Sequence, residues 1–275
     1  RVETGSTNTL IGANLDGNND ATERNVIASN GDVGIFLGGG TSGSVIRGNT
    51  IGIAADGVTA RGNNASGILV DGSNQTIGGT ANGAGNTIAN NAGMGVYVVT
   101  GSTGNAVLSN SIYANAGLGI GLASDGVSLN DTGDGDTGAN NLQNFPLLAS
   151  SITTGGNTVI SGSINSTANT TLRIEFFSSP TADATGYGEG STYLGHVMVT
   201  TDASGNATFN ASLSNISILS GQAVTATATV DMGGGNFGST SEFSQSILAT
   251  SVNSAPVLDT SKSPTLTAQN EDAGA

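Results

Sequence analysis

A short phrase that recurs at a fixed spacing is the feature that most limits how this 275-residue chain can fold. "NVIASNGDVGIFL" begins at Asn25, "NTIANNAGMGVYV" at Asn86 and "NSIYANAGLGIGL" at Asn110, and a copy with an insertion begins at Asn49. Asn25 and Asn49 are 24 residues apart, as are Asn86 and Asn110. Self-similarity at such a period indicates a solenoid, in which each repeat buries its apolar face against the next.

Each repeat carries three short apolar segments separated by Gly, Asn and Ser, which predicts three short strands per turn. Three strands in a turn of roughly 24 residues are typical of a parallel β-helix, whose turns stack at the ~4.8 Å spacing of paired strands. Three interior columns are expected: Ile27, Ile51, Ile88 and Ile112; Ile35, Ile68, Val96 and Ile120; and Leu37, Val70, Val98 and Leu122.

Two further sets of residues recur with the repeat. Asn25, Asn49, Asn86 and Asn110 fall at one corner, where their amides are expected to form a structural hydrogen-bonded ladder rather than a ligand site. Phe36, Leu69 and Tyr97 point outward between the second and third columns and predict an apolar stripe. Such a stripe could pack against a neighbouring domain or subunit, hold sugar rings or have no binding role.

Composition limits the partners and the location. The net charge of −14 disfavours nucleic-acid binding and is better suited to divalent cations. There is no Cys, and no run approaches the ~20 apolar residues of a membrane span, so no membrane insertion is expected. Few basic residues and abundant Asn, Ser and Thr suggest an extracellular or cell-surface protein. Because the chain starts at Arg1 without a signal peptide, we interpret it as a fragment or a processed product.

The pattern changes after Phe145 to alternating segments that predict an antiparallel β-sandwich. Leu172, Ile174 and Phe176 share one face of such a segment, and Arg173 and Glu175 lie on the opposite face. His196, the single histidine, has no recognisable base or metal partner nearby in sequence, so we expect a surface or inter-strand role for it.

An acidic segment lies between the two patterns. Asp131, Asp134 and Asp136 stand among Gly and Thr, and clustered carboxylates are what Ca²⁺ prefers. The spacing is not that of an EF-hand, because the twelfth position counted from Asp131 is Leu142 rather than Glu. The segment is therefore either a Ca²⁺ site or a solvated acidic turn.

Longer stretches resemble a known class of proteins. "NTIGIAADGVTARGN" and "QTIGGTANGAGNTIANNAGMGVYV" resemble the right-handed, pectin-lyase-like parallel β-helix repeats of large bacterial secreted and cell-surface adhesin-type proteins. "TLRIEFFSSP" and the segments after it resemble the immunoglobulin-like module that follows such repeats, and the tail resembles the start of a cadherin-like repeat. The resemblance implies an all-β chain with a β-helix over 1–128, an acidic junction over 129–145, an immunoglobulin-like β-sandwich over 146–250 and an extended tail or following repeat over 251–275.

The function expected from these features is structural and adhesive: a stiff extracellular spacer with a face that could bind cell-surface glycans or neighbouring domains. One alternative is a self-associating filament subunit, built by strand addition from the tail or by end-to-end stacking. The other is a polysaccharide lyase or hydrolase, for which Asp56, Arg61 and Asp71 near the insertion are the candidate residues. We do not expect an enzyme, because no two acidic residues recur at matching positions of the repeat.

Overall fold

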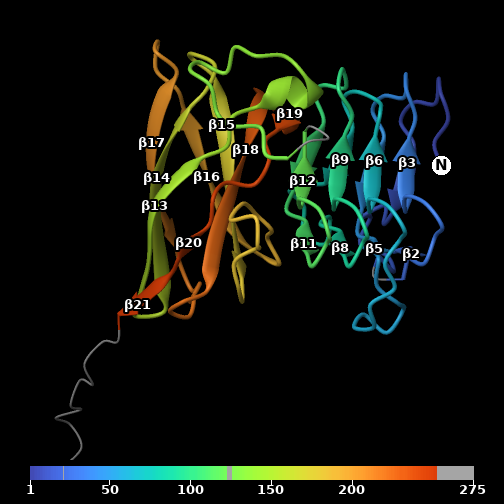
Figure 1. The fold of residues 1–275 in the computed structure, drawn as a ribbon, viewed down its shortest axis with the longest axis horizontal. Helices are drawn as coiled ribbons and strands as arrows, with labels where there is room; N and C mark the ends of the chain where they lie inside the picture. Colours follow the sequence, from blue (N-terminus) through green and yellow to red (C-terminus); the bar gives the residue numbers. More distant parts are fainter. Residues whose placement is uncertain (21, 123–125, 253–275) are drawn as a thin grey trace, which may run out of the picture.

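The computed structural model describes residues 1–20, 22–122 and 126–252, and it is an all-β structure with both parallel and antiparallel sheets (Figure 1). The one helical element in these ranges is a 3-10 turn, η1 (Ala139–Leu142). None of the described segments forms a helix long and apolar enough to cross a membrane.

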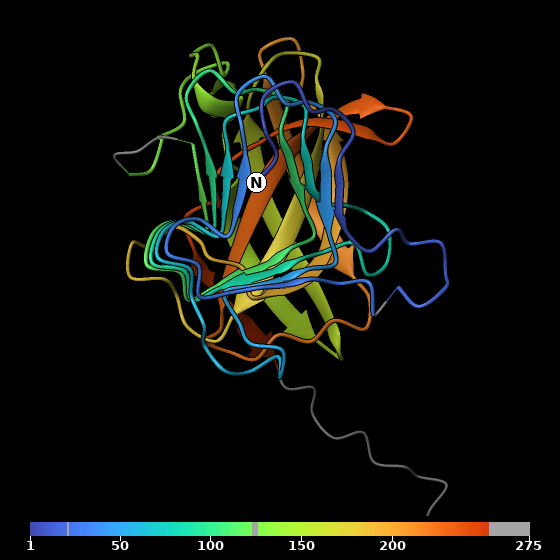
Figure 2. The ribbon, with the colours of Figure 1, turned by 90° about the vertical axis from the view of Figure 1, so that its right-hand side faces the viewer.

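The first part of the chain forms three four-stranded parallel sheets. One contains β1 (Leu10–Gly12), β4 (Val45–Arg47), β7 (Thr76–Gly78) and β10 (Ala106–Leu108). The second contains β2 (Val26–Ile27), β5 (Thr50–Ile51), β8 (Thr87–Ala89) and β11 (Ser111–Tyr113), and the third β3 (Ile35–Leu37), β6 (Ile68–Val70), β9 (Val96–Val98) and β12 (Ile120–Gly121). Because each turn of the chain adds one strand to each sheet, the turns superpose when viewed from the N-terminal end (Figure 2). We call residues 10–121 the stack.

The register of the parallel strands confirms the first two predicted columns and three members of the third, whose fourth member, Leu122, follows β12 and is buried in the same core. Ile27, Ile51, Ile88 and Ile112 pair in sequence, as do the members of the second column, and Leu37, Val70 and Val98 follow one another in the third. A fourth column of Ile11, Ile46, Ile77 and Val107 comes from the remaining sheet. Ile88 and Ile112 are 0% and 1% exposed, so the apolar side chains fill the interior of the stack.

Two sheets that are mainly antiparallel follow the stack. One has the order β17 (Asn206–Leu213), β14 (Asn157–Asn165), β13 (Leu147–Thr154), β21 (Thr250–Val252). The other has the order β16 (Thr192–Thr200), β15 (Thr171–Ser179), β18 (Ala223–Gly233), β19 (Asn236–Thr240), with β20 (Ile247–Leu248) also paired to β18. We call them the paired sheets, because a common apolar core joins them; Phe176 and Phe209, from different sheets, have ring centroids 5.6 Å apart.

The tail predicted over 251–275 lies almost entirely outside the described residues. Its first residues belong to β21, which pairs in parallel with β13 through Ile152 and Thr250.

The paired sheets close the C-terminal end of the stack. Phe177 and Phe243, which lie in and beside these sheets, are buried in the same apolar core as the stack's interior columns. Arg173 and Glu175 do lie on the face of β15 opposite its apolar residues, as predicted. That face covers the last turn of the stack, however, so both side chains are buried rather than solvated.

Candidate functional site

The three predicted metal ligands lie together in the loop between the stack and η1. One carboxylate oxygen from each of Asp131, Asp134 and Asp136 lies within 4.8 Å of the other two. The loop turns sharply because Gly133 and Asp134 adopt left-handed backbone conformations, with φ of 78° and 56°. The carboxylate of Asp134 is fixed from both sides, since it accepts hydrogen bonds from the backbone N–H of Asn144 at 2.8 Å and from the Ser166 hydroxyl at 2.7 Å.

The chemistry of this cluster fits a hard divalent cation. Oδ1 of Asp131 and Oδ1 of Asp136 are buried, and neither has a hydrogen-bond partner among the described residues. Burial, and then the Asp131 carboxylate, raise the pKa of Asp136; burial also raises the pKa of Asp134, with smaller contributions from Asp136 and Asp131. A bound cation would coordinate the two oxygens that lack hydrogen-bond partners and would offset the repulsion among the three carboxylates. Ca²⁺ takes 6–8 oxygen ligands at about 2.3–2.6 Å. The cluster can supply several of them.

The cluster is open to solvent on one side. Asp134 and Asp136 also line a cavity of about 540 Å³ that extends to Thr103 in the stack and to Met232 and Ser239 in the paired sheets. A cation at the cluster would therefore have room for water or other oxygen ligands in addition to the protein's own.

The predicted asparagine ladder is present and is structural. The side-chain amide of Asn25 donates to Oδ1 of Asn49 at 2.9 Å, Asn49 donates to Asn86 at 3.0 Å, and Asn86 to Asn110 at 2.8 Å. Asn49, Asn86 and Asn110 are buried, and their amides also bond backbone carbonyls inside the stack. No side-chain surface is left for a ligand at these three positions.

Two more ladders were not predicted. Asn30, Asn63, Asn91 and Asn115 form the second, and Ser44, Gln75, Asn105 and Asn140 form the third. A signal for the second was present in the sequence, because Asn30, Asn91 and Asn115 each follow a first-ladder asparagine by five residues. The third lacked such a signal, since its members are of different residue types.

Carboxylates from the paired sheets accept the N–H groups that remain at the end of the stack. Glu189 accepts from the backbone N–H of Asn115 at 3.2 Å and from its side-chain amide at 2.8 Å, and so ends the second ladder. Glu175 accepts from the backbone N–H of Ser109 at 2.8 Å, and Glu242 from that of Leu122 at 2.8 Å. We call Glu175, Glu189 and Glu242 the end carboxylates; all three are buried.

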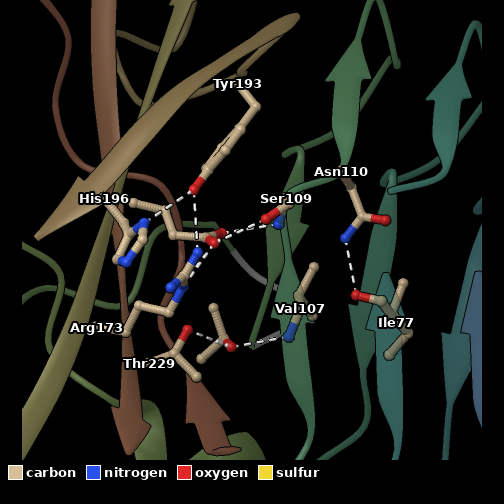
Figure 3. A network of polar contacts seen from close by, with 10 residues as sticks. Ile77, Val107, Ser109, Asn110, Arg173, Tyr193, His196 and Thr229 are labelled. Atoms are coloured by element: carbon tan, nitrogen blue, oxygen red, sulfur yellow. Dashed lines mark hydrogen bonds and ion pairs between the residues drawn. The ribbon is translucent and has the colours of Figure 1, made fainter. Parts of the chain in front are cut away.

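Glu175 bonds both Ser109 and Arg173, which are labelled in the polar network of Figure 3. Its carboxylate pairs with the Arg173 guanidinium at 2.8 Å, and Arg173 donates to the Tyr193 hydroxyl at 3.0 Å. The Tyr193 hydroxyl lies 3.3 Å from Nδ1 of His196 on the same strand, β16, and His196 is exposed, in line with the surface alternative expected for it. Burial raises the pKa of Glu175 while Arg173 opposes the shift, and burial followed by Arg173 lowers the pKa of His196. The network joins two strands of the paired sheets to the stack.

The predicted apolar stripe also exists as a set of neighbours. Phe36, Leu69 and Tyr97 pair in register across β3, β6 and β9, and all three are half-buried. The Arg1 guanidinium lies 4.5 Å from the centroid of the Phe36 ring. At the next turn Gly121 is buried beneath the Met94 side chain, so the stripe ends there.

Of the residues considered for polysaccharide chemistry, Asp56 is poorly suited to general-acid catalysis. Asp56 lies in an exposed loop of the insertion, where hydrogen bonds from Thr59 and Val58 lower its pKa to about 2. A carboxyl that stays ionised at neutral pH cannot act as a general acid. Arg61 exerts a weak electrostatic effect on Asp56, whereas Asp71 follows β6 and approaches Gly39.

Comparison with known proteins adds no identification: no protein-family model matches the chain, and no curated protein matches its sequence.

Glu189 should make stability depend on pH. Burial raises its pKa from 4.5 to about 7, with a small contribution from Asp183, although hydrogen bonds from Asn115 oppose the shift. Between pH 4.5 and 7 the folded chain therefore holds a proton that the unfolded chain has released, so stability falls as pH rises through this window and levels off above it.

This pH dependence is measured by thermal unfolding at pH 5 and pH 8 of the wild-type chain and of Glu189→Gln. The melting temperature of the wild type should fall more between the two pH values than that of the variant, because the variant lacks the titrating group. Equal falls in both proteins would contradict the assignment.

Proposed function

We propose that this chain is a rigid structural module of a bacterial extracellular or cell-surface protein. In this proposal the stack is a right-handed parallel β-helix, the paired sheets are an immunoglobulin-like β-sandwich, and the two together form a stiff spacer of adhesin type. The observation that carries the proposal is the sealed contact between them. Phe177 and Phe243 extend the apolar core across it, and the end carboxylates bond the last turn.

The rigidity of that contact is what a spacer requires. A flexible link between two domains lets them move independently, and a contact that is large and apolar prevents this. Here the contact combines a continuous core with buried charge-assisted hydrogen bonds, which are stronger than neutral ones. A force applied along the stack would therefore pass into the paired sheets without a hinge.

Small-angle X-ray scattering of the purified chain tests this proposal. The expected result is a scattering curve that fits one rigid body with the dimensions of the structure. Nuclear magnetic resonance gives a second measurement: residual dipolar couplings from the stack and from the paired sheets should fit a single alignment tensor. Two separate tensors for the stack and the paired sheets would rule out a stiff spacer.

We also propose that Ca²⁺ binds Asp131, Asp134 and Asp136 and stiffens the loop that leads from the stack to the paired sheets. A ligand that binds only the folded state raises the melting temperature, by an amount that grows with ligand concentration. We therefore expect Ca²⁺ to raise the melting temperature of the wild-type chain by several degrees relative to EDTA, and calorimetric titration to detect heat of binding.

The matched variants are Asp136→Asn and Asp56→Asn. The first removes one ligand charge at the cluster and should abolish most of the Ca²⁺ effect, whereas the second removes a charge from the exposed insertion and should leave the effect intact. Absence of both heat and stabilisation in the wild type would eliminate the cation site.

One observation favours a filament subunit as the second candidate. The outer edges of β1 and β2 have no neighbouring strand among the described residues, and Leu10 and Val26 are 44% and 46% exposed there. Open strand edges are templates for pairing with another chain. Sedimentation and electron microscopy at high protein concentration distinguish the two: filaments support this candidate, and a monodisperse monomer supports the spacer.

The stripe of Phe36, Leu69 and Tyr97 is the face we propose for neighbouring domains or cell-surface glycans. Two half-buried aromatic side chains that flank Leu69 in register offer apolar contact, which suits either partner. Binding to arrayed glycans by the wild type and by Tyr97→Ser is the experiment that tests the glycan partner, and equal binding by both proteins would exclude it.

A further inference from the structure

A cavity of about 420 Å³ lies between the last turn of the stack and the loop that joins β15 to β16. Tyr113 and Ala114 of the stack form one wall, and Pro180, Ala182 and Ala184 of the loop form the opposite wall. Figure 1 shows this loop beside β11. The volume falls within the range of about 300–1,000 Å³ typical of small-molecule sites, and mostly apolar walls are also typical.

The loop is clamped at its base, so the cavity is preformed. Gly190 pairs with Ile112 through two backbone hydrogen bonds, of 2.9 Å and 2.8 Å, which add the end of the loop to the sheet of β11. The backbone N–H of Ser191 also donates to the Ser179 hydroxyl at 3.1 Å, which ties the two ends of the loop together. A preformed site loses little binding free energy to the ordering of protein groups when the ligand binds.

The charged groups of the cavity are all acidic. Glu189 and Asp183 are the charged members of its lining, and Glu189 is only 7% exposed. Both carboxylates are held in place, Glu189 by Asn115 and Asp183 by the backbone N–H and the hydroxyl of Thr185. No Lys, Arg or His among the residues that the structure describes lines the cavity, so the lining favours a cationic ligand over an anionic one.

A cation on an apolar body matches this lining. The apolar part would contact Pro180, Ala182 and Ala184, and the cationic end would lie near Glu189 and Asp183. An ammonium group beside the Tyr113 ring would also gain a cation–π attraction. A buried carboxylate such as Glu189 attracts a ligand cation more strongly than an exposed carboxylate does, because less water screens the interaction.

We propose that this cavity is a binding site for an organic ammonium ligand, an amine carried on a short aliphatic or aromatic body. The site is separate from the cation cluster of Asp131, Asp134 and Asp136, and it does not depend on the spacer proposal. Ligands of this class include a lysine side chain of another protein and a free aromatic amine, and both present the same chemistry to the cavity.

The test uses three probes of nearly equal shape: phenethylammonium, 2-phenylethanol and 3-phenylpropanoate. The protein carries ¹³C-labelled alanine methyl groups, and the methyl resonances of Ala114, Ala182 and Ala184 report on the cavity at pH 8, where Glu189 is mainly ionised. Phenethylammonium should shift these resonances with an affinity at least tenfold above that of the alcohol, and the carboxylate should cause no shift. A parallel titration uses lysine amide acetylated at its α-amino group, which keeps the side-chain ammonium free. Its binding distinguishes a protein side chain from an aromatic amine as the ligand.

Two variants and one control complete the test. Glu189→Gln keeps an oxygen to accept from Asn115 but removes the charge, and should weaken phenethylammonium binding at least tenfold. Asp183→Asn removes the second charge from an accessible loop and should weaken binding without affecting the end of the stack. Asp202→Asn is the matched control, since Asp202 accepts similar turn hydrogen bonds at the other end of β16 and should bind as wild type.

Three results would overturn the proposal: alanine shifts absent with phenethylammonium, equal affinity for the alcohol, or unchanged affinity in both folded variants. If Glu189→Gln does not fold, Asp183→Asn alone decides the charge dependence against Asp202→Asn.

Discussion

Replacing Glu175 with Ala is expected to lower the free energy of unfolding by about 3–5 kcal/mol, because it leaves a buried cation without its counter-charge. Arg173 and Glu175 are 5% and 0% exposed, and their side chains are 2.8 Å apart. After the substitution the guanidinium would retain the Tyr193 hydroxyl as a partner, and the backbone N–H of Ser109 would lose its acceptor. Urea unfolding followed by far-ultraviolet circular dichroism measures the loss.

Glu3→Ala is the matched control for this substitution. Glu3 also forms an ion pair at 2.8 Å, with Arg1, but both side chains are about two-thirds exposed, at 68% and 66%. Exposed pairs contribute about 0–1 kcal/mol, so this variant should unfold close to the wild type. Similar losses for both glutamates would mean that burial of the Arg173–Glu175 pair has no energetic consequence.

The double variant Arg173→Met, Glu175→Leu separates charge from packing. Removing both charges together avoids the unpaired cation, so the double variant should be more stable than Glu175→Ala alone. It should remain below the wild type, because the Ser109 N–H would still lack an acceptor. A double variant less stable than Glu175→Ala would show that packing rather than charge dominates.

The parts of the fold that could be predicted from the sequence are those set by short-range periodicity. The interval of 24 residues between Asn86 and Asn110 aligns Ile88 with Ile112, and their burial follows from the alternation within each strand. The alternation in β15 likewise separated Leu172 from Arg173. The alternation could not reveal that the stack covers the face of β15 that carries Arg173 and Glu175, because the contact between Glu175 and Ser109 joins residues 66 positions apart.

The same distinction applies to the acidic cluster. Three aspartates within six residues, from Asp131 to Asp136, are close in space for most loop conformations, so their clustering could be predicted. Their orientation depends on Ser166 and Asn144, and the side chain of Ser166 comes from 32 positions away from Asp134. The 420 Å³ cavity was missed for the same reason, since its two walls come from residues near 113 and near 182.

Replacing Asn91 with Ala is the second change for which we expect a large effect, a loss of about 2–6 kcal/mol in the free energy of unfolding, because two buried donors would lose their acceptor. Oδ1 of Asn91 accepts two hydrogen bonds from Asn63, one from the backbone N–H at 3.2 Å and one from the side-chain amide at 2.8 Å. Both donors are buried, and a buried donor left unsatisfied costs about 1–3 kcal/mol. The side-chain amide of Asn91 also donates to Asn115 at 2.8 Å, so the substitution interrupts the ladder that ends on Glu189.

Asn64→Ala is the control, because Asn64 neighbours Asn63 but has an exposed position, and such surface substitutions change stability by about 0.5 kcal/mol or less. Hydrogen exchange locates the effect: the amides of Asn63 and of β5 and β8 should exchange faster in Asn91→Ala, since local opening requires less free energy where buried hydrogen bonds are lost. If Asn91→Ala unfolds at the same urea concentration as Asn64→Ala, the ladders do not stabilise the stack. In that case the apolar columns alone would hold its turns together, and the bond from Glu189 to Asn115 would add nothing to the rigidity of the contact with the paired sheets.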